Sequence, residues 1–175
     1  IETMANEICE QFIVPKVYPG THELAVSHLE RGEEVWIVTA SPRRVANILA
    51  RQLQFTGALG SEAEVADGVF TGRMLGPILH GKAKADAVRA WAAERDIDLS
   101  ACTAYSDSYN DLPLLETVGH PVVVNADRKL RATAKSRGWS SHDFRKLRLA
   151  RRFGPHTAVV AVCAGLLGAL RKRSK

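Results

Sequence analysis

The chain has 175 residues, 46% of them hydrophobic and 25% charged, a length and an apolar content that are ordinary for one globular domain. Its three cysteines, Cys9, Cys102 and Cys163, are scattered and lack metal-site spacing, which excludes a disulfide framework and indicates a reducing compartment. The net charge of +5 is unevenly distributed along the chain. Residues 1–127 carry 10 basic and 18 acidic side chains, whereas residues 128–175 carry 14 basic side chains and 1 acidic one.

The first part of the chain predicts a strand that ends in hydroxyl groups. The elements expected here are two helices, a buried strand and a third helix, over residues 2–12, 20–31, 35–40 and 42–54. Thr39 and Ser41 lie at the end of the strand, and Pro42 begins the following helix. Hydroxyl and free backbone N–H groups at such a junction can bind phosphate. The junction is therefore a candidate phosphate-binding site.

Residues 57–95 predict a hairpin followed by a helix. Ala66-Asp67-Gly68 is the expected turn within a strand-and-hairpin segment over 57–75. Lys84 lies at the start of a helix over 82–95, where its charge opposes the helix dipole unless an anion compensates it. Two interpretations of Lys84 stay open, a ligand for a bound anion and a solvated surface lysine.

Two acidic residues follow the next predicted strand. The strand covers 103–106, and Asp107, Asn110 and Asp111 lie where it turns into a helix over 109–118. The carboxyl edge of a parallel sheet is where α/β proteins bind their ligands. Carboxylate and amide oxygens at that edge suit Mg²⁺, which usually also binds substrate phosphate. The alternative is an aspartate helix cap followed by a solvated acid.

The remaining elements complete an alternating pattern. A strand over 121–124 precedes a helix over 127–137, and Asp96-Ile97-Asp98 is interpreted as a loop after the helix over 82–95. Strands that alternate with helices predict an α/β fold with a parallel, doubly wound (Rossmann-like) sheet.

The C-terminal segment is basic and apolar. We divide it into a basic linker over 141–152 and an apolar helix with a basic end over 153–175, of which residues 153–170 carry no charge. This uncharged run approaches the roughly 17–25 residues of a membrane-spanning helix, and basic flanks attract anionic lipid. We therefore expect residues 141–175 to contact an anionic membrane surface; the alternative is an apolar helix docked on the domain. No specific nucleic-acid binding is expected, because no recognised motif accompanies the charge.

Three motifs in this order resemble the haloacid dehalogenase superfamily of phosphatases, in the branch that includes phosphoserine phosphatase. Thr39 matches the hydroxyl that ends the second motif, and Lys84 matches the lysine of the third. Ser106-Asp107-Ser108-Tyr109-Asn110-Asp111 matches the Gly/Ser-Asp-x-x-Asn-Asp turn of the fourth. The resemblance covers residues 14–140, which we expect to form the phosphatase core, and residues 1–13 resemble a remnant of the family's helical cap.

The first motif of this family has no match. An apolar strand ending in Asp-x-Asp supplies the family's nucleophile, and none precedes Thr39. We expect these residues to be the C-terminal part of a longer protein, lacking the first central strand of the sheet and most of the cap. In the family that strand lies between the strands expected at 35–40 and 103–106, so their edges would be exposed or would pair directly. The isolated chain is then expected to be poorly folded or rearranged, and without turnover.

The resemblance implies a Mg²⁺-dependent phosphomonoester hydrolase in the cytoplasm, or attached to the inner face of the membrane, that acts on a small phosphorylated substrate through an aspartyl-phosphate. The residues it assigns are catalytic (Thr39, Lys84 and Asp107), substrate-binding (Thr39, Ala40, Ser41, Lys84 and Asn110) or serve the metal (Asp107 and Asp111). Asp107 would ligate Mg²⁺, while Asp111 would orient the metal site or bind a metal water. The alternative is a non-catalytic, membrane-attached binding protein on the same fold. A phospho-accepting receiver domain fits less well, because its acids precede its threonine and lysine in the chain.

Overall fold

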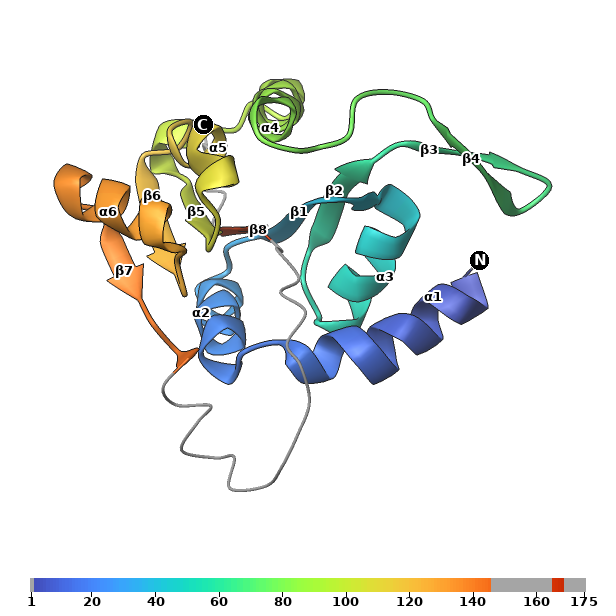
Figure 1. Cartoon of the computed structure of the whole chain (residues 1–175), viewed down its shortest axis with the longest axis horizontal. Coiled ribbons are helices and arrows are strands. Elements are labelled where there is room, and N and C mark those ends of the chain that lie inside the picture. The colour runs from blue at the N-terminus through green and yellow to red at the C-terminus, as the bar shows by residue number, and fades with distance from the viewer. Residues whose placement is uncertain (1, 146–164, 169–175) are drawn as a thin grey trace.

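The computed structural model describes residues 2–145 and 165–168, which form an α/β fold around a six-stranded sheet, with a two-stranded hairpin projecting from it (Figure 1). The strands are β1 (Val35–Pro42), β2 (Gly57–Ser61), β3 (Ala63–Ala66), β4 (Val69–Met74), β5 (Thr103–Ser106), β6 (His120–Val124), β7 (Ser140–His142) and β8 (Gly165–Gly168). The α-helices are α1 (Glu2–Ile8), α2 (Pro19–Glu30), α3 (Arg43–Gln52), α4 (Lys82–Glu94), α5 (Leu112–Leu115) and α6 (Arg128–Arg137). Short helical turns are η1 (Cys9–Ile13), η2 (Val14–Lys16), η3 (Leu99–Ala101) and η4 (Tyr109–Asp111).

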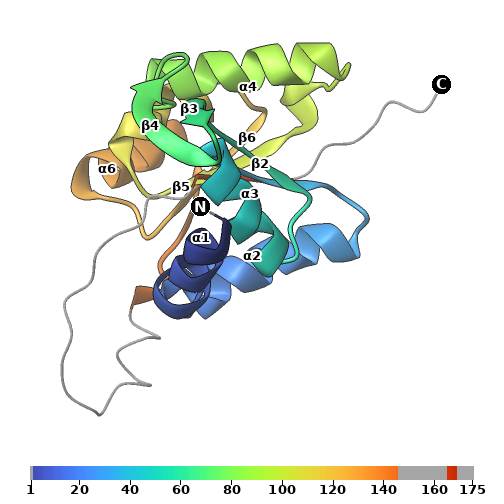
Figure 2. The same cartoon turned by 90° about the vertical axis from the view of Figure 1, so that its right-hand side faces the viewer.

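The strand order of the large sheet is β2-β1-β8-β5-β6-β7, and its strands run parallel except for β8. Helices α1, α2 and α3 lie on one face of the sheet, and α4, α5 and α6 lie on the other (Figure 2). This confirms the predicted doubly wound α/β fold. Because β1 and β5 run in the same direction, their carboxyl ends, with the predicted site residues, lie at one edge of the sheet.

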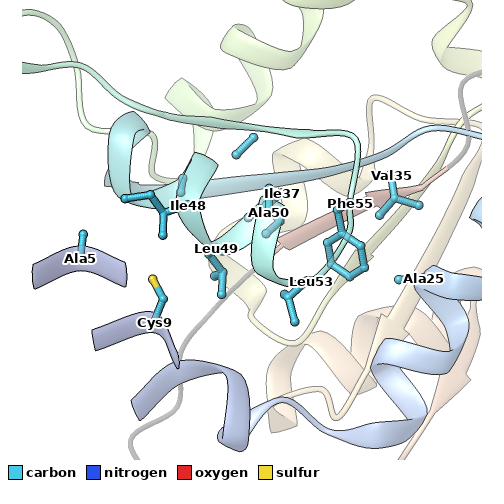
Figure 3. Packing of buried hydrophobic residues seen from close by; sticks show 12 residues of the cluster. Ala5, Cys9, Ala25, Val35, Ile37, Ile48, Leu49, Ala50, Leu53 and Phe55 are labelled. Carbon is cyan, nitrogen blue, oxygen red and sulfur yellow. The ribbon is translucent and has the colours of Figure 1, made fainter. Parts of the chain in front are cut away.

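Alternate side chains of β1 contribute to the cores on both faces. Val35 and Ile37 are buried with α1 and α3 (Figure 3), whereas Val38 packs with Val88 of α4 and Leu114 of α5. This strand is buried on both sides, as expected for a strand inside a parallel sheet. The turn that follows it is therefore fixed by packing on both faces.

Two predicted local structures have different outcomes. The hairpin turn is confirmed, since Asp67 and Gly68 have φ angles of 50° and 78°, the pair of positive values that a type I′ turn requires. The helix predicted over 109–118 is instead η4 followed by the four-residue α5. It ends early because the chain must return to β6. At Gly119 it passes so close to Ser100 that a Cβ would lie 1.7 Å from the Ser100 carbonyl oxygen.

The prediction for the C-terminal segment needs correction. The apolar helix expected over 153–175 is wrong for residues 165–168, which form β8, while the rest of that segment lies outside the described residues. The linker expected over 141–152 is described as far as 145, and its first two residues belong to β7. Within the described residues, no helix is both long and apolar enough to cross a membrane.

Strand β8 joins β1 and β5 into one sheet. It lies antiparallel between β1 and β5, with Gly168 opposite both Val35 and Thr103. Each of these strands would otherwise present an edge of unpaired N–H and C=O groups, which need partners when buried. In the described residues β8 pairs with both edges, so β1 and β5 neither pair directly nor leave these edges exposed.

Candidate active site

A buried ion pair lies at the carboxyl edge of the sheet. Nζ of Lys84, in the first turn of α4, is 2.7 Å from Oδ1 of Asp111, and their side chains are only 4% and 3% exposed. Burial of two charges is costly unless they are paired and their remaining polar atoms are satisfied. The sequence left Lys84 open between an anion ligand and a solvated residue; the structure rules out the solvated one.

Ser106 hydrogen-bonds the carboxylate of this pair. Its hydroxyl, at the end of β5, donates a hydrogen bond of 2.9 Å to Oδ2 of Asp111, so both carboxylate oxygens have a partner. The same hydroxyl accepts a hydrogen bond of 3.2 Å from the backbone N–H of Ser108. Ser106 therefore fixes both the carboxylate and the start of the loop that carries Asp107. Ser106 belongs to the fourth motif but had no predicted role, although a serine at a strand end next to an acid is a usable signal.

A second hydroxyl group lies at the end of β1. Thr39 is buried, and its Oγ1 accepts a hydrogen bond of 3.1 Å from the Ser41 N–H and donates one of 3.2 Å to the Ser41 hydroxyl. Ala40 and Ser41 are exposed beside it. The ladders of β8 end at Val38 on β1 and at Tyr105 on β5. Both strands thus continue beyond β8 at the level of Thr39 and Ser106.

Two residues that the sequence analysis missed hold this turn in place. Ser61 is fully buried, and its hydroxyl donates to the carbonyl oxygen of Ala40 (2.8 Å) and accepts from the N–H of Leu79 (2.9 Å). Gly60 lies so close to the turn that a Cβ there would be 2.6–2.8 Å from backbone atoms of Ser41 and Arg43. Both residues lie on β2, and no local pattern in the sequence links them to Thr39.

The loop that carries Asp107 is joined to α6. The N–H of Asp127 donates to the carbonyl oxygen of Asp107 (2.8 Å), and the Asp127 carboxylate accepts from the N–H of Tyr109 (2.6 Å). Asp127 also caps α6 by accepting from the N–H of Leu130. The Asp107 side chain is half-buried, and the Asn110 side chain is exposed. The alternative interpretation of Asp107 as a helix cap does not hold, because Ser108 caps η4.

These residues offer one carboxylate suited to direct metal ligation. Among residues 2–145, no three His, Cys, Asp or Glu side chains gather as a metal site. Mg²⁺, however, is usually held by one or two carboxylates, several waters and substrate phosphate. Asp107 fits such a ligand. Asp111 fits a supporting role better, because Lys84 and Ser106 already occupy its oxygens.

Known proteins resemble this chain over most of its length. Residues 1–116 match the family model described as haloacid dehalogenase-like hydrolase. The chain is 47% identical over 171 residues to phosphoserine phosphatase SerB1 of Mycobacterium tuberculosis, covering 97% of this chain and 56% of that protein. It is 37% identical over 168 residues to a probable phosphatase of the same organism, covering 95% of this chain and 58% of that protein.

Solved structures show the same fold. A protein of unknown function from Bordetella pertussis Tohama I superposes with a TM-score of 0.74 at 31% identity, over 81% of this chain and 65% of that one. A probable phosphoserine phosphatase from Vibrio cholerae superposes with a TM-score of 0.63 at 24% identity, over 80% of this chain and 41% of that one.

The chain therefore belongs to the haloacid dehalogenase-like hydrolase family. Among its relatives are proteins named phosphoserine phosphatase and probable phosphatase. The chain spans a little more than half of the length of these curated relatives.

Proposed function

We propose that the full-length protein is a Mg²⁺-dependent phosphomonoester hydrolase acting on a small phosphorylated substrate. The observation that carries the proposal is the buried Lys84–Asp111 pair, held by Ser106 at the edge of the sheet where the hydroxyls of β1 also lie. A lysine buried at a helix N-terminus is unfavourable for folding alone. It is useful, however, where negative charge must be neutralised during phosphoryl transfer.

Each site residue has a role in this proposal. Thr39, with the backbone N–H of Ala40 and with Ser41, binds the oxygens of the transferred phosphoryl group. Lys84 neutralises the charge of the phosphate and of the nucleophile, and Asn110 contacts the substrate phosphate. Hydrogen bonds between Thr39 and Ser41, and from Ser61 to Ala40, hold this turn in advance, so binding does not have to order it.

Asp107 and Asp111 serve the metal in different ways. Asp107 ligates Mg²⁺ directly, and the ion supplies positive charge to the phosphate oxygens. Asp111 orients Lys84 and the end of β5, and it reaches the metal through a bound water. The supporting evidence is the half-buried position of Asp107 and the two partners of Asp111.

The nucleophile has no counterpart in this chain. The resemblance implies that turnover through an aspartyl-phosphate uses an Asp-x-Asp directly after an apolar strand, and no strand among the described residues is followed by one. Asp96 and Asp98 form the one Asp-x-Asp of the sequence, but they lie in the loop and turn between α4 and β5. We expect residues 1–175 alone to show no turnover. The name of one relative makes phosphoserine the first substrate to test.

Asp107→Asn in the full-length protein tests the metal assignment. With p-nitrophenyl phosphate and increasing Mg²⁺, we expect activity to fall by roughly 10²-fold or more, since a lost electrostatic contact to the transferred group costs about that much. Asp96→Asn is the matched control, because Asp96 is exposed and has a φ of 54°, which asparagine tolerates. Equal activities of the two variants would contradict the proposal. They would instead favour a non-catalytic binding protein on this fold.

The proposed location is the cytoplasm, with the basic side chains of residues 146–152 and 171–175 at the inner face of a membrane. The uncharged residues 153–164 and the basic side chains around them support attachment, although residues 165–168 belong to the sheet. Membrane fractionation of the full-length protein, first in high salt and then in detergent, tests this. A protein that partitions identically when Arg148, Arg151 and Arg152 are replaced by glutamine contradicts it.

A further inference from the structure

The chain that follows β7 reaches the start of α2 at the carboxyl edge of the sheet (Figure 1). There Phe144 packs on Gly20, in the first turn of α2. A Cβ at position 20 would come within 2.8 Å of three atoms of the Phe144 ring, so a larger residue does not fit while the ring stays in place. Glycine is otherwise unfavourable inside a helix. The ring therefore gives a packing reason for a glycine at this position.

Asn125, directly after β6, holds the backbone of the same segment. Its side-chain oxygen accepts a hydrogen bond of 2.7 Å from the N–H of Phe144, and its own N–H donates one of 2.9 Å to the carbonyl oxygen of His142. Asn125 has a φ of 53°, a left-handed conformation that asparagine adopts more readily than most residues. The ring of Phe144 is thus fixed by α2 and its backbone by the turn after β6.

The turn after β6 also holds the loop that carries Asp107. Two residues beyond Asn125, the N–H of Asp127 donates to the carbonyl oxygen of Asp107, and the Asp127 carboxylate accepts from the N–H of Tyr109. Residues 125–127 therefore bind the segment of Phe144 at one end and the Asp107 loop at the other.

Arg145 lies close to both of the connected regions. It donates a hydrogen bond of 2.9 Å to Asp143. This interaction raises the pKa of Arg145, and the charges of Tyr18 and Asp107 add to the increase. Tyr18 directly precedes α2. The guanidinium group is therefore near enough to the start of α2 and to Asp107 to interact with both charges.

We infer that residues 142–145 form a strap that ties the start of α2 to the Asp107 loop, and that Phe144 is a positioning residue for the proposed active site. Since α2 and α6 lie on opposite faces of the sheet, the strap joins the two faces at the carboxyl edge (Figure 2). The positioning role rests on the proposed function, whereas the strap itself does not.

The sign of the effect of Gly20→Ala tests the contact between ring and helix. Alanine normally stabilises a helix relative to glycine. With the Phe144 ring in place, Gly20→Ala is expected to lower the urea midpoint of the full-length protein, because the new methyl group displaces the ring. In a Phe144→Ala background the same substitution should raise the midpoint. Shifts of the same sign in both backgrounds would overturn the strap.

Amide hydrogen exchange of the full-length protein without Mg²⁺ tests the other end of the strap. In Phe144→Ala, the amides of Tyr109 and Asp127 should exchange several-fold faster than in wild type. Asn125→Gly should have the same effect, since glycine keeps the left-handed conformation but lacks the acceptor for the strap. Phe70→Ala, which removes a half-buried ring from the projecting hairpin, is the control and should leave these amides unchanged. Unchanged exchange in Phe144→Ala would overturn the link.

Hydrolysis of p-nitrophenyl phosphate by the full-length protein tests the positioning role. Phe144→Ala is expected to lower kcat by about tenfold with little change in KM, because small displacements of catalytic groups cost up to about 10²-fold. Phe144→Tyr keeps the ring and should retain the wild-type kcat. A wild-type kcat in Phe144→Ala, or equal losses in the two variants, would overturn the positioning role alone. A wild-type protein without phosphatase activity would contradict the proposed function and the positioning role, whereas the two preceding experiments decide the strap.

Discussion

The buried pair of Lys84 and Asp111 is the residue-scale feature on which the site depends. Its burial means that neither charge is compensated by water if the other is removed. Ser106 adds a hydrogen bond to the same carboxylate. Stability and chemistry are therefore coupled at these residues, and separating them requires paired substitutions.

Lys84→Met should lower the free energy of unfolding by about 3–5 kcal/mol, because it leaves the Asp111 carboxylate buried without its counter-charge. Adding Asp111→Asn should restore a large part of this loss, since the amide is neutral and can still accept from Ser106. Urea unfolding of the single and double variants measures both effects. A double variant no more stable than Lys84→Met would show that the two charges do not depend on each other.

At the scale of elements, a polar cluster ties the end of α2 to β5. His28 is buried, and its ring nitrogens lie 2.5 Å from Oε2 of Glu33 and 2.6 Å from the hydroxyl of Tyr105. Arg31 donates two hydrogen bonds to the Glu33 carboxylate. Tyr105 immediately precedes Ser106, so this cluster anchors the strand that leads into the site.

The cluster should make stability depend on acid pH. The hydrogen bond from Arg31, with a further one from His28, lowers the pKa of Glu33 despite its burial. Because the folded-state pKa is depressed, this stabilisation is present above the unfolded pKa of about 4.3 and is lost as the pH falls through the folded value. The free energy of unfolding should therefore fall less between neutral pH and about pH 3 in Glu33→Gln than in wild type. Glu23→Gln, at an exposed position on α2, is the control. An unchanged pH dependence in Glu33→Gln would contradict the assignment.

Sequence periodicity was sufficient to place most elements, because a buried strand such as β1 and a helix such as α4 each have a local apolar pattern. It also placed Thr39, Lys84 and Asp107 at the correct strand and helix ends. It could not supply contacts between distant segments. The pairing of Lys84 with Asp111, the support of Ala40 by Ser61 and the place of β8 depend on which elements become neighbours, and no local pattern encodes that.

On the scale of the whole molecule, β8 connects the two halves of the large sheet, β2-β1 and β5-β6-β7. It is the strand through which β1 and β5 are joined, and it makes ladders with both. A central strand needs its backbone N–H groups for both neighbours, so proline is poorly tolerated there.

Leu167→Pro should therefore weaken the sheet at its centre. Amide hydrogen exchange in the 175-residue chain should accelerate for Val35–Val38 and for Thr103–Tyr105, while the amides of α4 stay better protected. Val69→Pro, in the projecting hairpin, is the matched control and should leave these amides unchanged. Protection of β1 and β5 that is the same in wild type and Leu167→Pro would show that β8 is not their partner.

The most direct test of the proposed phosphatase compares two lysines that lie two residues apart on α4. Lys84 is buried against Asp111, whereas the Lys82 side chain is 81% exposed and pairs with Asp86. Steady-state hydrolysis of phosphoserine by the full-length protein, at saturating Mg²⁺ and at a temperature where each variant is folded, should fall by roughly 10²-fold or more in Lys84→Met. It should change less than about twofold in Lys82→Met, since a solvated charge contributes little. Equal activity in the two folded variants would contradict a catalytic role for the buried lysine.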